Sequence, residues 1–457
     1  MALKWTSNHE GGQASPARSQ LRTSIKAAAI GSAIGLGTLM SAPAMALKTD
    51  FGMEYRATAF AVQSDAFDGG SGTSETDNGI GHLIRVKANF LDEDTGISVY
   101  TSVELAGDRW TGDDRKYGTT NPQGFNTSSR GDNVRLDLGY VQIPVGHTIF
   151  RVGRQATSYN NCFLTCDDRR DRVLMIQPLN KTTTMVLGYD RRADTNTFAN
   201  QDNGDMVLLG VTGKLSESWN AGLLFVKWMD NYDGTVAYTP TPYALNGVNL
   251  VSGYVTGGLG DVAKATLGFN HFSDGKVEGA ADEQYFTDQS PSGYFRLEGD
   301  VGPMNWGVQY VTARDGGLIA PGFDTYSSLI NSNPDATQSA TSMYRMGGTL
   351  GVKDYDEDLV IGKLTWNVTD KFAVTGAVGQ LSVDNALIDA DDDSMVYDLQ
   401  FAYQVNKALR TWLSVGMLEK NKAGTLSGNG LIGSLSGMNT FADDDVKAAS
   451  LNMTVNF

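Results

Sequence analysis

The chain ends in the stretch Ala449–Phe457, ASLNMTVNF, in which apolar and polar residues alternate. Its apolar residues stand at every second position: Leu451, Met453, Val455 and Phe457. The residues between them are polar and uncharged: Ser450, Asn452, Thr454 and Asn456. Successive side chains of a β-strand point to opposite faces, so this period of two predicts a strand with one apolar and one polar face.

The same alternation recurs upstream. It is present in SMVYDLQFAYQVN (394–406), NVRLDLGYVQI (133–143) and GISVYTSVEL (96–105). In segment 133–143 the parity predicts an apolar face of Val134, Leu136, Leu138 and Tyr140, opposed to Arg135, Asp137 and Gly139. Such segments have about the ten residues that a tilted strand needs to cross a bilayer.

Short connectors alternate with long polar ones between these segments. The short connectors are 92–96, 144–147, 180–183, 216–218, 260–261, 302–303, 369–370 and 406–407. The long connectors are 64–79, 108–131, 159–171, 192–204, 231–246, 274–291, 315–355, 385–393 and 420–445. This layout predicts an all-β fold, a transmembrane antiparallel up-and-down β-barrel of about 18 strands. Sixteen strands is the alternative, because residues 343–352 could be a strand or part of a loop.

A closed barrel explains the layout better than the soluble alternatives do. A β-sandwich also alternates apolar and polar residues, but it rarely needs long and short connectors in strict alternation. A β-helix would have a short sequence repeat, and none is visible. In lipid every backbone polar group needs a partner, and strands achieve this only in a closed sheet. An even strand count places both termini at the end of the short turns.

The N-terminal segment has the features of a secretory signal. Basic residues precede the apolar run Ala27–Met40, which is followed by SAPAMA with small residues at Ala44 and Ala46. This pattern predicts a cleaved signal peptide over 1–46. Residues 47–457 would then form the barrel, with short periplasmic turns and long extracellular loops, in the outer membrane of a Gram-negative cell.

Charge and histidine content exclude several function classes. The net charge of the chain is −16, and the leader holds four basic residues but one acid, so the mature chain is more acidic still. Nucleic-acid binding needs a basic surface and is not expected. The chain has 4 His and lacks a zinc-binding His pair or a phosphate loop, so we expect no enzyme, no cofactor and no metal site.

With this layout and a C-terminal Phe457, the sequence resembles Gram-negative outer-membrane porins, most of which end in a strand that closes on an aromatic residue. The resemblance implies that the last strand, with Phe457, is the signal read by the barrel-assembly machinery. The stretch FRVGRQ (150–155) followed by DDRRDR (167–172) is also similar to porins related to alginate-export channels, which have 18 strands.

Parity assigns a set of charged residues to the lumen of the barrel. The basic members are Arg56, Arg85, Lys87, Arg135, Arg151, Lys264, Arg296, Lys363 and Arg410. The acidic members are Glu54, Glu104, Asp137, Glu298 and Asp398. A charge on the lipid face would cost about 2–4 kcal/mol at the midplane, which favours the inward placement. The basic excess favours anionic solutes, and the alternative role of these residues is to form cross-strand pairs that stiffen the wall.

The segment YNNCFLTCDDRRDR (159–172) is the most distinctive connector. In porins the third loop commonly folds inward, so we expect Asp167, Asp168, Arg169, Arg170, Asp171 and Arg172 near the constriction. The alternative is a solvated surface loop. Cys162 and Cys166 are the two cysteines of an exported chain, which favours a disulfide bond between them.

The other long loops are strongly acidic, and calcium binding or bridging through divalent ions to lipopolysaccharide phosphates is one interpretation of them. Charge runs are more often simply solvated. The predicted function is a porin whose water-filled channel passes small hydrophilic solutes and ions. One alternative is a channel specific for anionic carbohydrates or carboxylates, and another is a structural barrel around a periplasmic partner. The expected surroundings are outer-membrane lipid and lipopolysaccharide, with a homotrimer as one possible assembly.

Overall fold

The computed structural model describes residues 47–64, 76–106, 134–193, 204–230, 246–274, 287, 289–331, 341–426, 440–441 and 444–457. The predicted signal peptide, 1–46, lies outside the described residues. Within the part that the structure describes, no helix is both long and apolar enough to cross a membrane.

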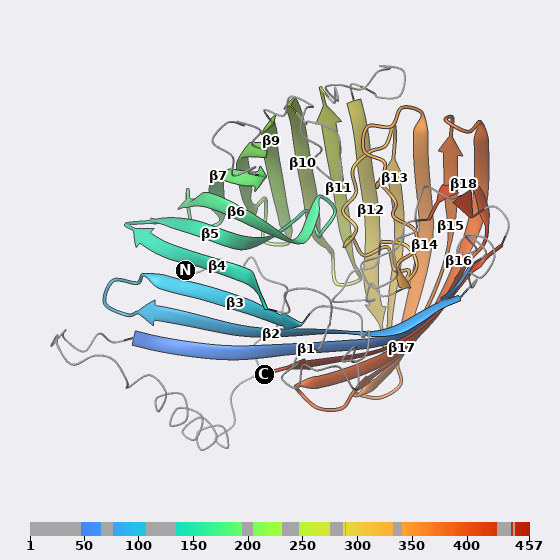
Figure 1. The fold of residues 1–457 in the computed structure, drawn as a ribbon, viewed down its shortest axis with the longest axis horizontal. Helices are drawn as coiled ribbons and strands as arrows, with labels where there is room; N and C mark the ends of the chain where they lie inside the picture. The colour runs from blue at the N-terminus through green and yellow to red at the C-terminus, as the bar shows by residue number, and fades with distance from the viewer. Residues whose placement is uncertain are drawn as a thin grey trace, which may run out of the picture.

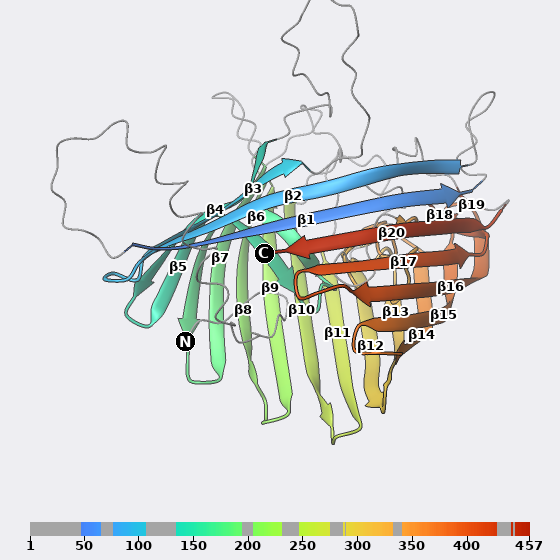
Figure 2. The same cartoon turned by 90° about the horizontal axis from the view of Figure 1, so that it is seen from below.

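Eighteen strands form one antiparallel sheet that closes on itself. The strands are β1 (Leu47–Gln63), β2 (Thr76–Asp92), β3 (Ser98–Ala106), β4 (Arg135–Val145), β5 (Thr148–Tyr159), β6 (Thr165–Pro178), β7 (Thr183–Ala193), β8 (Gly204–Lys214), β9 (Trp219–Asp230), β10 (Asn246–Leu259), β11 (Ala263–Ser273), β12 (Gln289–Val301), β13 (Met304–Ala313), β14 (Tyr355–Asn367), β15 (Phe372–Asn385), β16 (Ala390–Gln404), β17 (Leu409–Leu418) and β20 (Val446–Asn456). Each strand pairs with its neighbours in sequence, and β20 lies between β17 and β1, which closes the ring (Figure 2). The predicted barrel of 18 strands is confirmed.

The two faces of the wall differ as the alternation predicts. On β16 the side chains of Tyr397, Leu399 and Phe401 are exposed, whereas that of Val396, which precedes Tyr397, is fully buried. On β20 Leu451 is 55% exposed and its neighbour Asn452 is 1% exposed. The apolar face therefore points outward, where hydrocarbon would surround it, and the polar face points into the lumen.

One predicted face is wrong in part of β4. Asp137 is an extra residue in the pairing with β3, because Ser102 lies opposite Leu138 while Val103 lies opposite Leu136. Such a β-bulge reverses the parity of the residues that follow it. Leu136 stays on the outer face as predicted, but Tyr140 lies in the lumen, where its ring stacks on that of Tyr100 at 5.4 Å.

The start of β1 and the last residue, Phe457, both lie at the end of the barrel that carries the short turns. The backbone amide of Phe457 donates to the carbonyl of Met53 at 2.9 Å, so the last residue is held to β1. The ring of Phe457 is 79% exposed on the outside of the wall. An exposed aromatic residue at a strand end fits the aromatic girdle of membrane barrels.

Two predicted long loops are in fact hairpins. Asp167–Arg172 lie on β6, and the connection from β5 is the turn 160–164. Likewise, β15 and β16 run on until the turn 386–389. A strand can continue through polar residues when its backbone stays hydrogen-bonded to the neighbouring strand and its charged side chains pair with residues there. The strand ends predicted from polar residues were therefore wrong at these two places.

The longest described connection, between β13 and β14, fills part of the lumen. We call residues 314–331 and 341–354 the inner segment; it has no regular secondary structure and lies over β12, β13 and β14 in Figure 1. Its apolar side chains Ile319, Phe323, Leu329, Ile330, Met343 and Met346 are fully buried, and they pack with residues of the inner wall. A small second sheet, β18 (Asn421–Thr425) with β19 (Thr440–Phe441), lies in the connection from β17 to β20.

Candidate functional site

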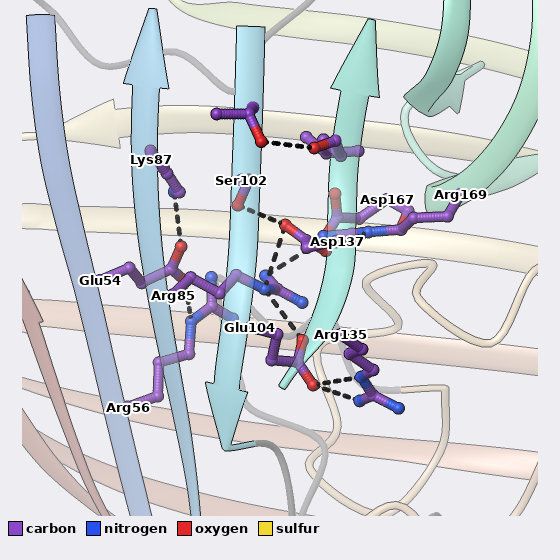
Figure 3. Close-up of polar contacts among 12 residues, drawn as sticks. Glu54, Arg56, Arg85, Lys87, Ser102, Glu104, Arg135, Asp137, Asp167 and Arg169 are labelled. Carbon is purple, nitrogen blue, oxygen red and sulfur yellow. Dashed lines mark hydrogen bonds and ion pairs between the residues drawn. The ribbon is translucent and has the colours of Figure 1, made fainter. Parts of the chain in front are cut away.

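A network of charged side chains lies on the inner face of β1 to β4 (Figure 3). Glu54 on β1 accepts from Arg56 Nε at 2.5 Å and from Lys87 Nζ at 2.6 Å. The Glu54 side chain is 5% exposed, whereas that of Lys87 is 36% exposed. The carboxylate is thus buried between two cations, and the ammonium group of Lys87 remains in contact with the lumen.

The same network continues on β2, β3 and β4. Glu104 accepts from Arg85 Nε at 3.3 Å and from Arg135 Nε at 2.7 Å. Asp137 accepts from the Ser102 hydroxyl at 2.8 Å, and Arg85 Nε lies 3.4 Å from its Oδ2. The charges of this network are therefore paired with one another, mostly across strands and, for Arg56 and Glu54, along β1. Such pairs correspond to the alternative role predicted for these residues, which is to stiffen the wall.

The network reaches a strand that is not adjacent in the wall. Arg169 on β6 donates from Nε to Asp137 Oδ1 at 2.7 Å, and Asp167 lies 4.0 Å from Arg85. Because β5 separates β4 from β6, the far end of the β5–β6 hairpin must fold over the inner wall. In Figure 1 this end leaves the line of the wall and curves toward β11 and β12.

The tip of the hairpin contacts the opposite wall. The Asn160 amide donates to the carbonyls of Gly253 and Phe269 on β10 and β11, at 3.1 and 3.3 Å. Asn161 donates to the Tyr294 hydroxyl on β12 at 2.8 Å. The Phe163 ring, fully buried, lies 4.7 Å from that of Tyr294. The hairpin is therefore held on both sides of the lumen and crosses it.

A disulfide bond joins Cys162 and Cys166 at this tip. Asn160, Asn161 and Cys162 all have a positive φ, so the backbone makes a left-handed turn immediately before Phe163. Ordinary residues adopt this conformation at a cost of roughly 1–2 kcal/mol each. The covalent link encloses Phe163 and fixes the short turn that presents its ring to the far wall.

The other charged residues of the hairpin pair within it or with β7. Arg172 forms a buried ion pair with Asp190, and Arg170 pairs with Asp168. Asp171 is 60% exposed and lies 4.0 Å from Arg154 on the neighbouring strand β5. The six residues predicted at a constriction therefore share one hairpin, and Arg169 and Asp167 extend their contacts beyond the adjacent strands, to β4 and β2.

The inner segment is anchored by a second group of predicted lumen residues. The Tyr326 hydroxyl donates to Glu298 at 2.8 Å, and Lys363 Nζ lies 3.8 Å from the Tyr326 ring centre. Arg296 donates to the carbonyl of Asp324 at 2.5 Å and its guanidinium faces the same ring at 5.0 Å. Cations over aromatic faces are attracted by the ring quadrupole. These side chains hold the loop rather than face an open pore.

The remaining predicted lumen residues are spread over the wall. Asp398 on β16 accepts from the backbone amide of Ser328 at 3.0 Å, so it also anchors the inner segment. Arg410 lies over the Trp412 ring at 5.0 Å, and Arg151 lies over Tyr140 at 5.6 Å. Lys264 is opposite Glu298 in the register of β11 and β12. The predicted lumen residues thus share one face but not one site.

Sequence reasoning missed the inner segment as a contributor to the lumen. Tyr344 of this segment donates to Glu357 on β14 at 2.5 Å, and the backbone amide of Gly347 donates to the same carboxyl at 2.7 Å. Burial, with Glu357 nearby, holds the pKa of the Tyr344 hydroxyl well above its usual range, so the hydroxyl stays protonated and can donate. Several of its polar residues are buried as well: Thr325, Ser327, Ser328, Asn331 and Thr341. Ser, Thr and Asn are also typical of surface loops, so no local signal in the sequence marks these residues as buried.

No model of a known protein family matches the chain, and no curated protein matches it. Several solved structures match the chain. OccK9 (OpdG) of Pseudomonas aeruginosa superposes with a TM-score of 0.57 at 13% identity, over 90% of this chain and 98% of that one. OccAB2 of Acinetobacter baumannii superposes with a TM-score of 0.54 at 12% identity, over 90% and 98%. The outer membrane protein opdK of P. aeruginosa gives 0.53 at 11% identity, over 89% and 99%.

At these identities the likeness concerns the fold. The class of fold is that of outer-membrane β-barrels, as the sequence predicted, and the matches cover 90% and 89% of this chain. The narrower resemblance to alginate-export channels stays a prediction.

Proposed function

We propose that this chain is an outer-membrane channel through which small hydrophilic solutes and ions diffuse. The closed 18-stranded barrel, with an apolar outside and a charged inner wall, carries the proposal. Lipid requires the closed sheet, and a hydrated lumen is what stabilises charged side chains such as Lys87 and Arg135 inside it. The channel would act by diffusion and without covalent chemistry.

A narrow, selective channel is favoured over a wide one. The inner segment and the β5–β6 hairpin both occupy the lumen, and a solute must pass the space that they leave. This occupancy supports the alternative of a channel specific for an anionic carbohydrate or carboxylate. It weighs against a barrel that sheathes a periplasmic partner, because such a barrel would need a clear lumen.

Orientation and surroundings are part of the proposal. By analogy with outer-membrane barrels, the short turns would lie in the periplasm and the long connections outside the cell. Outer-membrane lipid and lipopolysaccharide would surround the barrel, the assembly machinery would read the strand that ends at Phe457, and a homotrimer remains one arrangement to test.

Liposome swelling with neutral sugars of increasing size tests the proposal most directly. We expect swelling with small sugars and a sharp cutoff at small size, and no swelling at any size would contradict it. Reversal potentials in a salt gradient test the charge preference. Anion preference would support the excess of basic residues in the lumen, and cation preference would contradict it.

A further inference from the structure

The inner segment is docked on the wall through a carboxyl that the proposed function does not use. Glu357 on β14 is 1% exposed. Its two oxygens accept from two groups of the inner segment, the Tyr344 hydroxyl at 2.5 Å and the Gly347 amide at 2.7 Å. Both bonds join the wall to the inner segment, so this one side chain holds the segment at two points.

The carboxyl lies in an apolar part of the inner wall. In the strand register Glu357 is opposite Ala313 on β13 and Val383 on β15, which are 0% and 2% exposed. The hydroxyl of Tyr355, a residue 3% exposed, lies 3.4 Å from that of Tyr344. A carboxylate in such surroundings loses its hydration, and its burial is costly unless a cation lies beside it.

Within the described chain no cation is paired with this carboxyl. The basic side chains of the elements packed around it are exposed or pair with other carboxylates: Arg314 and Arg345 of the inner segment and Lys422 of β18. Arg314 pairs with Asp356 and Asp358, which flank Glu357 on β14 and point to the outer side of the wall, because side chains alternate along a strand. Two further acidic groups therefore lie near Glu357 and oppose its ionisation.

This end of β14 lies beyond the apolar band of the wall. The side chains of Asp356 and Asp358 are 38% and 31% exposed on the outer face, where a charge that faced hydrocarbon would be costly. Glu357, between them, is therefore outside the membrane-spanning part of the strand. Burial raises the pKa of Glu357 to about 7, and the nearby Asp356 and Asp358 add to the rise. A solvated Glu has a pKa of about 4.3.

Both hydrogen bonds to the carboxyl come from the place where the parts of the inner segment join. The Tyr344 amide donates to the Leu329 carbonyl at 2.9 Å, and the Tyr344 carbonyl accepts from the Asn331 amide at 3.2 Å. The Gly347 carbonyl accepts from the Ile319 amide at 3.5 Å. Release from the carboxyl would therefore loosen several stretches of the inner segment together.

We propose that Glu357 is a proton-operated latch, which holds the inner segment on the wall while its carboxyl is neutral and releases the segment when the carboxyl ionises. In the neutral form one oxygen accepts from the Gly347 amide, and the other carries the proton and donates it to the Tyr344 hydroxyl. Ionisation passes this proton to water and leaves a buried negative charge without a cation. The charge regains its hydration only when the segment leaves the wall.

The latch predicts how the channel responds to pH. The docked carboxyl binds its proton more tightly than a solvated one does, so docking is strongest in acid. It weakens as the pH rises from about 4.3 through about 7. The lumen should therefore be narrower in acid and wider in alkaline solution. This regulation rests on the proposed function, because a change in width matters only in a barrel that conducts.

Cysteine accessibility tests the inference. Met346→Cys places a thiol in the inner segment at a residue that is 0% exposed, and Asp391→Cys is a control thiol at a side chain that is 89% exposed. The native cysteines are joined in the disulfide and do not react without a reductant. Each folded variant is treated with sulfonatoethyl methanethiosulfonate at about pH 5 and about pH 9. Mass spectrometry measures the labelling rate relative to the control thiol, because thiol reactivity itself depends on pH. Planar bilayers measure the current.

We expect the relative labelling rate of Met346→Cys to rise by roughly ten-fold or more between the two pH values, and the conductance of the unmodified barrel to rise as well. Glu357→Gln, whose amide can make both hydrogen bonds but cannot ionise, should show neither rise. Glu298→Gln is the matched control. Glu298 also accepts from a tyrosine of the inner segment, but it has Lys363 at 3.5 Å, so this variant should keep both rises.

An equal relative labelling rate of Met346→Cys at both pH values would overturn the inference, as would an unchanged rise when Glu357→Gln is added. The first criterion leaves Glu357 in place, so it decides the matter even if Glu357→Gln does not fold. If the unmodified barrel passes no current at either pH, the proposed function fails, while the labelling rates still decide whether the latch opens.

Discussion

Arg169 on β6 and Asp137 on β4 form an ion pair of 2.7 Å although β5 lies between their strands in the barrel wall. The contact is made across the lumen side of β5, because the β5–β6 hairpin folds inward at its far end. The bulge at Asp137 helps to place this carboxylate, with Ser102 and Arg85, on the inner face. One ion pair therefore connects the β5–β6 hairpin to the inner wall at β4.

Loss of the Arg169–Asp137 pair should loosen the hairpin. Arg169→Gln leaves Asp137 with its Ser102 and Arg85 contacts, so the barrel should fold while the hairpin loses roughly 1–3 kcal/mol of anchoring. We expect higher conductance and more open-channel noise in planar bilayers. Asp171→Asn is the matched control, because Asp171 lies on the same hairpin and is largely exposed. Equal currents in Arg169→Gln and the wild type would contradict a restraining role.

Removal of the aromatic contact at the hairpin tip should have a larger effect. Phe163 lies 4.7 and 4.9 Å from the rings of Tyr294 and Phe323, and truncation of a buried Phe costs about 3–5 kcal/mol. Phe163→Ala should raise the size cutoff in liposome swelling. The control is Phe295→Ala, since Phe295 is 46% exposed on the outer face and should leave the cutoff unchanged. A cutoff that moves equally in both variants would argue against a specific anchor.

Reduction of the disulfide should free the turn without unfolding the barrel. For so short a loop the entropy of closure amounts to about 2 kcal/mol. We expect trypsin to cleave after Arg169 and Arg170 faster in reduced than in oxidised protein, with circular dichroism of the barrel unchanged. Cys162→Ala/Cys166→Ala should cleave at the reduced rate with or without reductant. Identical cleavage rates of the oxidised and reduced wild type would show that other contacts hold the turn in place without the disulfide.

A positive charge should be tolerated on one face of the wall and not on the other. Leu209 on β8 is 46% exposed on the outside, and Gln400 on β16 lies on the inner face, where it donates to the Ser414 hydroxyl. Leu209→Lys should lower the stability of the barrel in liposomes by about 2–4 kcal/mol, whereas Gln400→Lys should change it little. Urea unfolding of each variant in lipid vesicles measures the change in the free energy of unfolding. Equal losses would reject the assignment of the faces.

The exposed terminal ring should matter for assembly more than for stability. Phe457 makes its hydrogen bonds to Met53 through the backbone, so Phe457→Ala preserves them. We expect a several-fold lower yield of folded barrel in the outer membrane of cells, and normal refolding of the purified chain in detergent. Normal yield in cells would contradict the assembly role, and Phe51→Ala, another exposed ring on β1, controls for loss of an aromatic side chain.

The wall of the barrel was predictable from local sequence patterns. In a strand the pleat sets the side-chain direction residue by residue, so alternation placed Glu54, Arg85, Lys87 and Glu104 in the lumen and Leu399 and Leu451 outside. The alternation of short and long connectors predicted 18 strands. Short connectors lie at one end of the barrel and long connectors at the other, so each change from short to long corresponds to one crossing strand. These features depend on neighbours in sequence, which the sequence displays directly.

The segments that occupy the lumen could be identified only in the folded structure. The Phe163–Tyr294 contact joins residues more than a hundred positions apart, and Tyr326 reaches Glu298 only because the inner segment folds back over β12. Composition does not distinguish a loop that folds inward from one that is solvated, since both are rich in polar residues. The bulge at Asp137 could be recognised only from the register of β4 with β3. A bulge is defined by one residue more than the partner strand has, and the sequence of one strand does not show this.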